Sequence, residues 1–140
     1  MSRPIRRVAT SILLHGDRIL ILKRSAAVGS FQHHWSGVSG FVEPGESLEE
    51  AVRREVAEET GIAVGDIRYQ SSQPWPFPAS LMLGFYATAE SEEIHRNAEE
   101  LEDARWFTRT ELRDGSAGLA GRRRSDSIAR WLIRAWVEAD

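Results

Sequence analysis

The strongest chemical signal in the sequence is a group of glutamates on the apolar side of a predicted helix over residues 47–60. Glu55 and Glu59 are one helical turn apart, and Glu58 lies at the edge of the same side. That side also carries apolar residues that should pack on a sheet, namely Leu48, Ala51, Val52 and Val56. A surface helix normally places its carboxylates on the opposite side, because burying an unpaired carboxylate costs several kcal/mol.

These carboxylates require positive charge nearby. Arg54 is one source, since it can pair with Glu58 one turn later or with Glu46 before the helix. One arginine cannot balance three carboxylates, whereas divalent cations can, and oxygen ligands favour Mg²⁺, Mn²⁺ or Ca²⁺ over zinc. Two interpretations are open at this point: a metal site, or a salt-bridged amphipathic helix whose glutamates reach past the core into solvent.

The spacing around the helix favours the metal site. Gly40 is followed after five residues by Glu46, and Glu46 after seven residues by Arg-Glu-Val-Ala-Glu-Glu-Thr-Gly-Ile, residues 54–62. This pattern resembles the Nudix box at every fixed position, and the similarity to a Nudix domain extends over essentially the whole chain. The resemblance implies an α/β (or α+β) fold, an α/β/α sandwich around a mixed sheet. It also implies a hydrolase that cuts the pyrophosphate bond of a nucleoside diphosphate derivative.

The same resemblance gives roles to the residues of the box. The metal ligands it implies are Glu55, Glu58, Glu59 and the backbone carbonyl of Ser39. Arg54 resembles the residue that orients the glutamates, and Glu46 resembles its partner. The implied cofactors are Mg²⁺ or Mn²⁺, which neutralise phosphate oxygens and make a water molecule nucleophilic. A glutamate near the metals takes the proton of that water, and no covalent enzyme intermediate is expected.

A second motif, Ser-Gln-Pro-Trp-Pro-Phe-Pro-Ala-Ser, occupies residues 72–80. It resembles the loop that marks the NADH pyrophosphatase branch of the Nudix family, and residues 100–106 and 127–136 are also similar to that branch. The implied reaction converts NAD(H) and water to nicotinamide mononucleotide and AMP, and the same chemistry removes an NAD cap from RNA. The alternative interpretation of the loop is a rigid apolar plug against the sheet.

The branch resemblance implies further site residues. Glu100 resembles an additional metal ligand or base, although its charged surroundings also fit a solvated surface. Phe41 is expected to stack on a ring of the substrate, and Ala129 resembles a substrate contact. The substrate-binding loop consists of Gln73, Pro74, Trp75, Pro76, Phe77, Pro78, Ala79 and Ser80. Members of this branch form homodimers whose sites take residues from both chains, so we expect a homodimer.

Substrate choice within the family stays open. Members of the NADH pyrophosphatase branch usually carry a zinc ribbon of four cysteines, and this sequence has no cysteine. Residues 24–40 look more like those of other small Nudix pyrophosphatases, so ADP-ribose or an oxidised nucleoside triphosphate is the alternative substrate. A sensor that binds without turnover would be expected to have lost box glutamates, and all of them are present.

The remaining elements follow from hydrophobic periodicity and turn residues. Strands are expected over residues 8–14, 18–22, 35–42, 67–72, 81–88 and 104–107, and a second helix over 127–137. Loops are expected over residues 24–34, 73–80 and 115–124, and a loop or edge over residues 91–102.

Length and composition fit one soluble domain over residues 1–140. The chain is 41% hydrophobic and 28% charged, with a formal net charge of −3. The absence of cysteine excludes disulfides, thiolate metal sites and a cysteine nucleophile. The apolar stretch near the N-terminus is too short for a signal peptide, and no run is long enough to cross a membrane. We therefore expect a cytoplasmic protein without membrane attachment.

Overall fold

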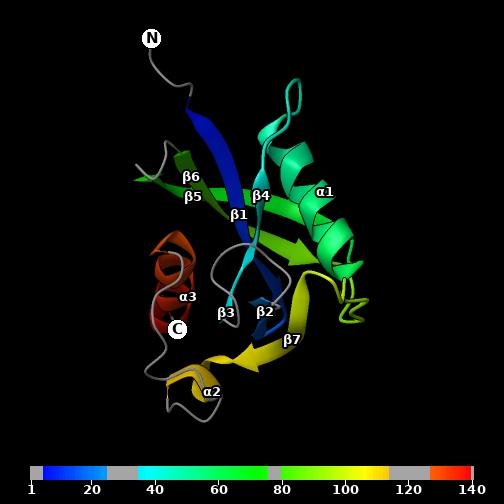
Figure 1. Ribbon diagram of the computed structural model, residues 1–140. Helices are drawn as coiled ribbons and strands as arrows, with labels where there is room; N and C mark the ends of the chain where they lie inside the picture. Colours follow the sequence, from blue (N-terminus) through cyan, green and yellow to red (C-terminus); the bar gives the residue numbers. More distant parts are fainter. Residues whose placement is uncertain (1–4, 25–34, 76–79, 114–126, 140) are drawn as a thin grey trace.

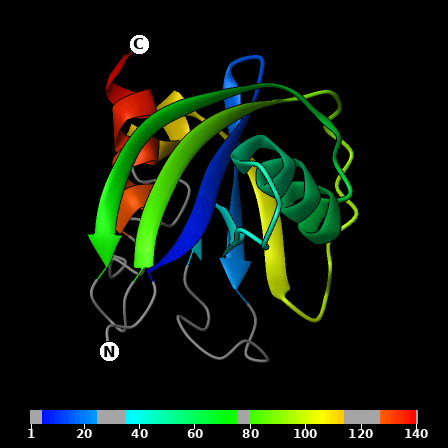
Figure 2. The same ribbon diagram turned by 90° about the horizontal axis from the view of Figure 1, so that it is seen from above.

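The computed structural model describes residues 5–24, 35–75, 80–113 and 127–139, which form seven strands and three helices. The strands are β1 (Arg6–His15), β2 (Arg18–Arg24), β3 (Trp35–Ser36), β4 (Val38–Phe41), β5 (Val64–Trp75), β6 (Ser80–Ala89) and β7 (Leu101–Thr108). The helices are α1 (Leu48–Thr60), α2 (Arg109–Arg113) and α3 (Ser127–Ala139). All strands join one sheet, and α1 and α3 lie on its opposite faces (Figures 1 and 2). The predicted α/β/α sandwich is confirmed.

The central strand of the sheet is β1. It pairs in parallel with β6 and antiparallel with both β2 and β4. The strand β5 runs antiparallel to β6, while β3 and β7 run antiparallel to β2. The sheet is therefore mixed, as predicted. Val42 continues the pairing beyond β4 through a hydrogen bond of 2.9 Å from its amide to the carbonyl of Arg7. The loop that leads into α1 is thereby fixed to the central strand.

Successive residues of a strand point to opposite faces, so β1 and β2 contribute to two cores. One core lies against α1 and includes Leu13, Leu20 and Val56. The other lies against α3 and includes Ile12 and Ile19. This double burial explains why β1 and β2 read as nearly continuous apolar runs rather than as alternating patterns.

Both ends of α1 form as the sequence predicts. The side chain of Ser47 accepts a hydrogen bond from the amide of Glu50, and the Glu50 side chain accepts one from the amide of Ser47. At the other end Gly61 adopts a φ of 73°, and its amide binds the carbonyl of Ala57 at 2.9 Å. With both ends fixed, the rotation of the helix about its axis is set, and so is the direction of its glutamates.

Two predicted boundaries are wrong, and one helix is missing from the prediction. The loop expected over residues 73–80 is shorter, because Gln73, Pro74 and Trp75 continue β5 and pair with β6. Pro74 is tolerated there because β5 is an edge strand, where a missing N–H disrupts no ladder. The strand β7 begins at Leu101, inside the segment expected as a loop or edge over residues 91–102, since it pairs with the end of β2. The short helix α2 was not predicted. Of the loop expected over residues 24–34, Arg24 is the last residue of β2 and the rest lies outside the described residues, as does the loop expected over residues 115–124.

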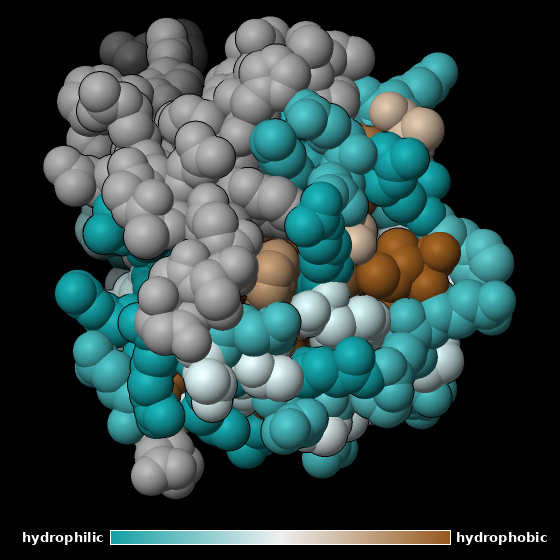
Figure 3. Space-filling model, turned by 90° about the horizontal axis from the view of Figure 1, so that it is seen from below, coloured by the Kyte–Doolittle hydropathy of each residue, from teal (hydrophilic) through white to brown (hydrophobic). Residues whose placement is uncertain are grey.

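The surface seen from below in Figure 3 is mostly hydrophilic where the structure is described, with apolar side chains in small separate patches. No helix among the described residues is long and apolar enough to span a membrane.

Gly84 gives a test of the packing of α3 on the sheet. A Cβ at this position would lie 2.9 Å from Cγ1 of the buried Ile128 and 3.2 Å from Cδ1 of Leu132. We expect Gly84→Ala to lower the free energy of unfolding by about 1–3 kcal/mol, because the added methyl overpacks this core. Gly65→Ala is the matched control, since the nearest atom to its Cβ would be 3.5 Å away. Urea denaturation measures both, and equal loss of stability in the two variants would contradict the packing.

Candidate active site

Arg54 makes more hydrogen bonds in the candidate site than any other side chain described there. Its Nε and Nη2 bind the two carboxylate oxygens of Glu46 at 2.6 and 3.0 Å, which is the two-pronged arrangement that favours arginine over lysine. Nη2 also donates to the backbone carbonyl of Phe41 at 3.0 Å, and Nη1 donates to Glu55 at 2.6 Å. One side chain therefore joins the loop before α1, the end of β4 and the helix itself.

The charge of Arg54 affects the acids that it contacts. The hydrogen bond from Arg54 and a further one from the amide of Glu43 lower the pKa of Glu46 to about 2. Glu46 is therefore ionised at any ordinary pH. Arg54 and Glu46 therefore form an ion pair in the structure. Because Nε and Nη2, along one edge of the guanidinium, bind Glu46, only Nη1 is left to contact the glutamates of the helix.

Glu55 lies directly against the backbone of β4. A Cβ built on Gly40 would come within 2.1 Å of its carboxyl carbon, so only glycine leaves room for this carboxylate. Its side chain is only 14% exposed. Burial raises the pKa of Glu55, and the hydrogen bond from Arg54 opposes that effect. Ser39, the residue before Gly40, lies at the same point of β4, where its hydroxyl is 2.8 Å from that of Thr10.

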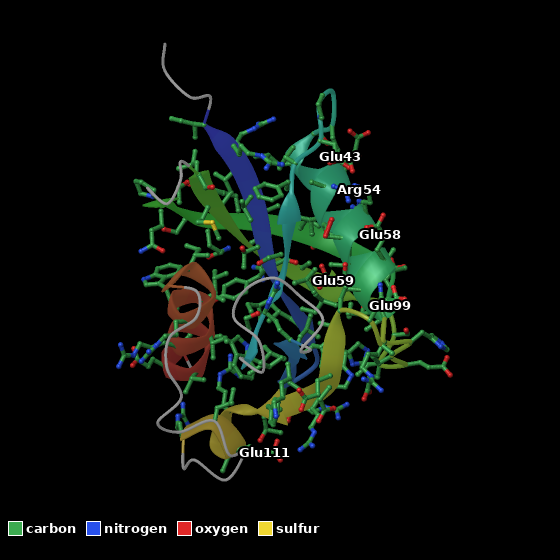
Figure 4. The ribbon with its side chains drawn as sticks, viewed as in Figure 1. Glu43, Arg54, Glu58, Glu59, Glu99 and Glu111 are labelled. Carbon is green, nitrogen blue, oxygen red and sulfur yellow. The ribbon has the colours of Figure 1, made fainter. Side chains whose placement is uncertain are left out.

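Glu59 is more deeply buried, with only 6% of the residue exposed. Burial is the main cause that raises its pKa to about 9, and the neighbouring charge of Glu55 adds to the effect. The two carboxyl groups share a hydrogen bond, so the pair retains one proton near neutral pH. In Figure 4, Glu59 lies between α1 and the sheet, whereas Glu58 lies farther out along the helix.

The outer acids are arranged differently. The Glu58 side chain is 59% exposed and lies 3.5 Å from Nη1 of Arg54. Glu100 is also exposed, but it lies close enough to Glu59 for its charge to raise the pKa of that group. The predicted acids therefore gather around one end of α1, with two inside and two at the solvent boundary.

This donor set fits a divalent cation. All of the donors are carboxylate or carbonyl oxygens, which Mg²⁺ and Mn²⁺ prefer. The buried pair of Glu55 and Glu59 keeps a proton that a dication could replace, since the charge of Arg24 opposes the rise in the pKa of Glu59 only in part. Across the described ranges, no three acidic or histidine side chains already converge into a complete ligand set. Glu58 and Glu100 lie at the exposed rim beside the buried pair.

Of the predicted substrate residues, Gln73 and Phe41 lie on the face of the sheet that α3 covers in part. Register partners form one row across the strands, from Gln73 through Met82 and Val8 to Phe41. Phe41 is 45% exposed. Ala129 is buried in the first turn of α3. Ser80 begins β6, Pro74 belongs to β5, and the side chain of Trp75 and residues 76–79 lie outside the described part.

Three neighbours of the site were missed by sequence reasoning. The guanidinium of Arg6 stacks on the Phe41 ring, 3.6 Å from its centroid. The charge of Arg24 partly opposes the rise in the pKa of Glu59. Asn97 donates its backbone amide to the carbonyl of Glu59 at 3.0 Å. All three are contacts between distant segments and leave no local pattern. An acidic neighbour of Arg54, Glu43 at 3.7 Å, could have been found from its spacing to Glu46.

The buried carboxyl pair predicts how the free energy of unfolding depends on pH when a chelator keeps the protein free of metal. In the unfolded chain Glu59 has the pKa of an exposed glutamate, about 4.3, and loses its proton near that pH. In the folded chain it keeps the proton until about pH 9. The folded state therefore binds the extra proton, and the free energy of unfolding falls as pH rises through this window. The slope is at most about 1.4 kcal/mol per pH unit.

Urea denaturation at several pH values measures this slope. Glu59→Gln should flatten it, and Glu49→Gln, an exposed position on the same helix, should not. A wild-type stability that rises between pH 5 and pH 9 would contradict the burial of this proton.

Comparison with known proteins agrees with this geometry. A model of the Nudix domain matches residues 5–132. Nudix hydrolase 19, chloroplastic, from Arabidopsis thaliana is 53% identical over 106 residues, covering 72% of this chain and 24% of that protein. The NAD-capped RNA hydrolase NudC from Pseudomonas syringae pv. syringae is 44% identical over 134 residues, covering 94% of this chain and 45% of that protein. The chain thus spans less than half the length of either relative.

The fold is also similar to that of a solved Nudix structure. The crystal structure of a Nudix hydrolase from Nitrosomonas europaea superposes with a TM-score of 0.78 at 22% identity, covering 99% of this chain and 73% of the other. From the domain match over nearly all of its length, this chain belongs to the Nudix family.

Proposed function

We propose that this protein is a metal-dependent pyrophosphohydrolase whose substrate is NADH or NAD⁺. Water would attack one phosphorus atom of the pyrophosphate, the bond from that atom to the bridging oxygen would break, and nicotinamide mononucleotide and AMP would leave. The observation that carries the proposal is the buried pair of Glu55 and Glu59 beside Arg54, on a chain of the Nudix family.

The proposed metal ligands are Ser39 through its carbonyl, Glu55, Glu58, Glu59 and Glu100. When bound, Mg²⁺ or Mn²⁺ supplies the positive charge that stabilises the phosphate oxygens and makes a water molecule nucleophilic. Arg54 and Glu46 hold the Glu55 carboxylate in place, and Gly40 gives it room. The proton of the attacking water passes to one of the outer or inner carboxylates, Glu58, Glu59 or Glu100.

The row from Gln73 to Phe41 supports a substrate with an aromatic ring and an amide or amino group. Among the described residues, the Oε1 atom of Gln73 is a buried acceptor without a hydrogen-bond partner. A buried acceptor without a partner is rare, and an N–H donor on a ligand would satisfy it. Phe41 at the far end offers a half-exposed ring already covered on one side by Arg6. Nicotinamide and adenine both combine a flat ring with N–H donors.

The relatives support the same substrate class. The Pseudomonas syringae relative is named an NAD-capped RNA hydrolase and covers nearly all of this chain in its match. We therefore include NAD-capped RNA among the proposed substrates. We also propose that the protein acts in the cytoplasm as a homodimer, the arrangement implied by its resemblance to the NADH pyrophosphatase branch.

A product assay by chromatography tests the proposal. NADH, NAD⁺, ADP-ribose and 8-oxo-dGTP are offered separately with Mg²⁺ or Mn²⁺ and with a chelator. We expect metal-dependent release of AMP and reduced nicotinamide mononucleotide, with NADH preferred. Glu59→Gln should lower kcat by at least about a hundredfold, because it removes a ligand at the reacting centre. Glu49→Gln should retain wild-type activity.

The outcomes separate the parts of the proposal. Full activity of Glu59→Gln would contradict the proposal that Glu59 is a metal ligand. Turnover of ADP-ribose or of the oxidised triphosphate without turnover of NADH would retain the pyrophosphatase chemistry and contradict the NAD assignment.

A further inference from the structure

The segment before β7 is attached to the C-terminal end of α1 through backbone hydrogen bonds. The last carbonyls of a helix have no partner within it. Here the amide of His95 donates to the carbonyl of Thr60 at 2.7 Å, and the amide of Asn97 donates to that of Glu59 at 3.0 Å. A Cβ on Gly61 would meet Cβ of His95 at 2.8 Å, so the segment lies directly on the end of the helix.

Asn97 is the residue in which these bonds converge. Its carbonyl accepts hydrogen bonds from the amides of Glu100 at 3.1 Å and Leu101 at 2.9 Å. Its side-chain Oδ1 accepts a third, from the amide of Glu99 at 3.1 Å, which is the turn that asparagine characteristically forms with its own backbone. Through its backbone amide and its backbone carbonyl, Asn97 therefore links the backbone of Glu59 to the backbone of Glu100. In Figure 4 the labelled neighbour Glu99 lies beside the end of α1.

The two flanks of the turn are fixed independently. Arg96 donates from Nη1 to the carbonyls of Leu101 and Glu102 at 2.7 and 2.8 Å, and the Leu101 side chain is buried in the core under α1. On the other side, the indole of Trp106 binds the carbonyl of Glu92 at 3.0 Å. Glu100 itself is exposed, so its own side chain does not anchor it. Its position relative to Glu59 is set by the turn.

We infer that Asn97 is a positioning residue that holds Glu100 at a fixed place relative to the backbone of Glu59. This inference rests on the proposed function, in which Glu100 serves the same site as Glu59. The Oδ1 bond to the amide of Glu99 adds a side-chain contact to the two backbone bonds that hold this turn, so the asparagine side chain helps to fix the path of residues 98–100. Asn97 acts through Glu100 and is not itself placed in contact with substrate.

Side-chain variants of Asn97 test this role. Asn97→Ala removes the Oδ1 acceptor and should lower kcat by about tenfold to a hundredfold, in the range found for residues that orient metal ligands. Asn97→Asp keeps an acceptor at the same place and should restore kcat to within about threefold of wild type. Ser91→Ala, an exposed truncation in the same segment, is the matched control and should behave as wild type. Thermal unfolding of each variant checks that the fold is retained.

A double-mutant cycle separates positioning from general damage. Glu100→Gln should lower kcat by itself, and adding Asn97→Ala to it should cause no further loss, because the residue that Asn97 positions is already disabled. Fully additive losses would overturn the inference, and so would a Glu100→Gln variant with unchanged activity.

A second measurement does not depend on turnover. Free Mn²⁺ is followed by electron paramagnetic resonance during titration of the metal-free protein. Asn97→Ala should weaken Mn²⁺ binding by about tenfold or more, and Asn97→Asp should restore it. Equal affinity of Asn97→Ala and wild type would overturn the inference even if the wild-type enzyme is active. If the wild type turned over no nucleotide, the proposed function would fail, and this titration would still decide the role of Asn97.

Discussion

Two carboxyl groups, those of Glu55 and Glu59, lie next to each other between α1 and the sheet, where both lose solvation and the charge of Glu55 raises the pKa of Glu59. Arg54 relieves only Glu55, since its other nitrogens are held by Glu46 and by the carbonyl of Phe41. The pair must therefore keep a proton or bind a cation. A protein gains nothing in stability from such an arrangement, and strained electrostatics of this kind mark functional sites. Our proposal of a metal site at α1 rests on this pair.

The rest of the fold holds this pair in place. The pairing of β4 with β1 sets the position of Gly40, whose lack of a side chain admits the Glu55 carboxylate. The caps at Ser47 and Gly61 fix the rotation of α1, so that two glutamates face inward. Cores on both faces of the sheet keep β1 rigid between the helices. The site is thus built on a strand and a helix, with exposed Glu58 and Glu100 at its rim.

Sequence reasoning succeeded where the signals were local. The capping box, the glycine stop and the inward glutamates of α1 all follow from residues within a few positions of one another, and the structure has all three. It failed where tertiary pairing decided the outcome. The extension of β5 through Pro74 depends on its place at the edge of the sheet, and the start of β7 depends on pairing with the end of β2. The bond from Asn97 to Glu59 joins two backbones, so no side-chain pattern could predict it.

The central claim is that a divalent cation takes the place of the proton shared by Glu55 and Glu59. Calorimetric titration of the metal-free protein with Mn²⁺ at pH 8, in buffers of different ionisation enthalpy, measures how many protons leave when the metal binds. Because the pKa of Glu59 is about 9, we expect close to one proton released per protein in the wild type and none in Glu59→Gln. Tight binding of Mn²⁺ with no proton released, or with equal release from both proteins, would contradict the account.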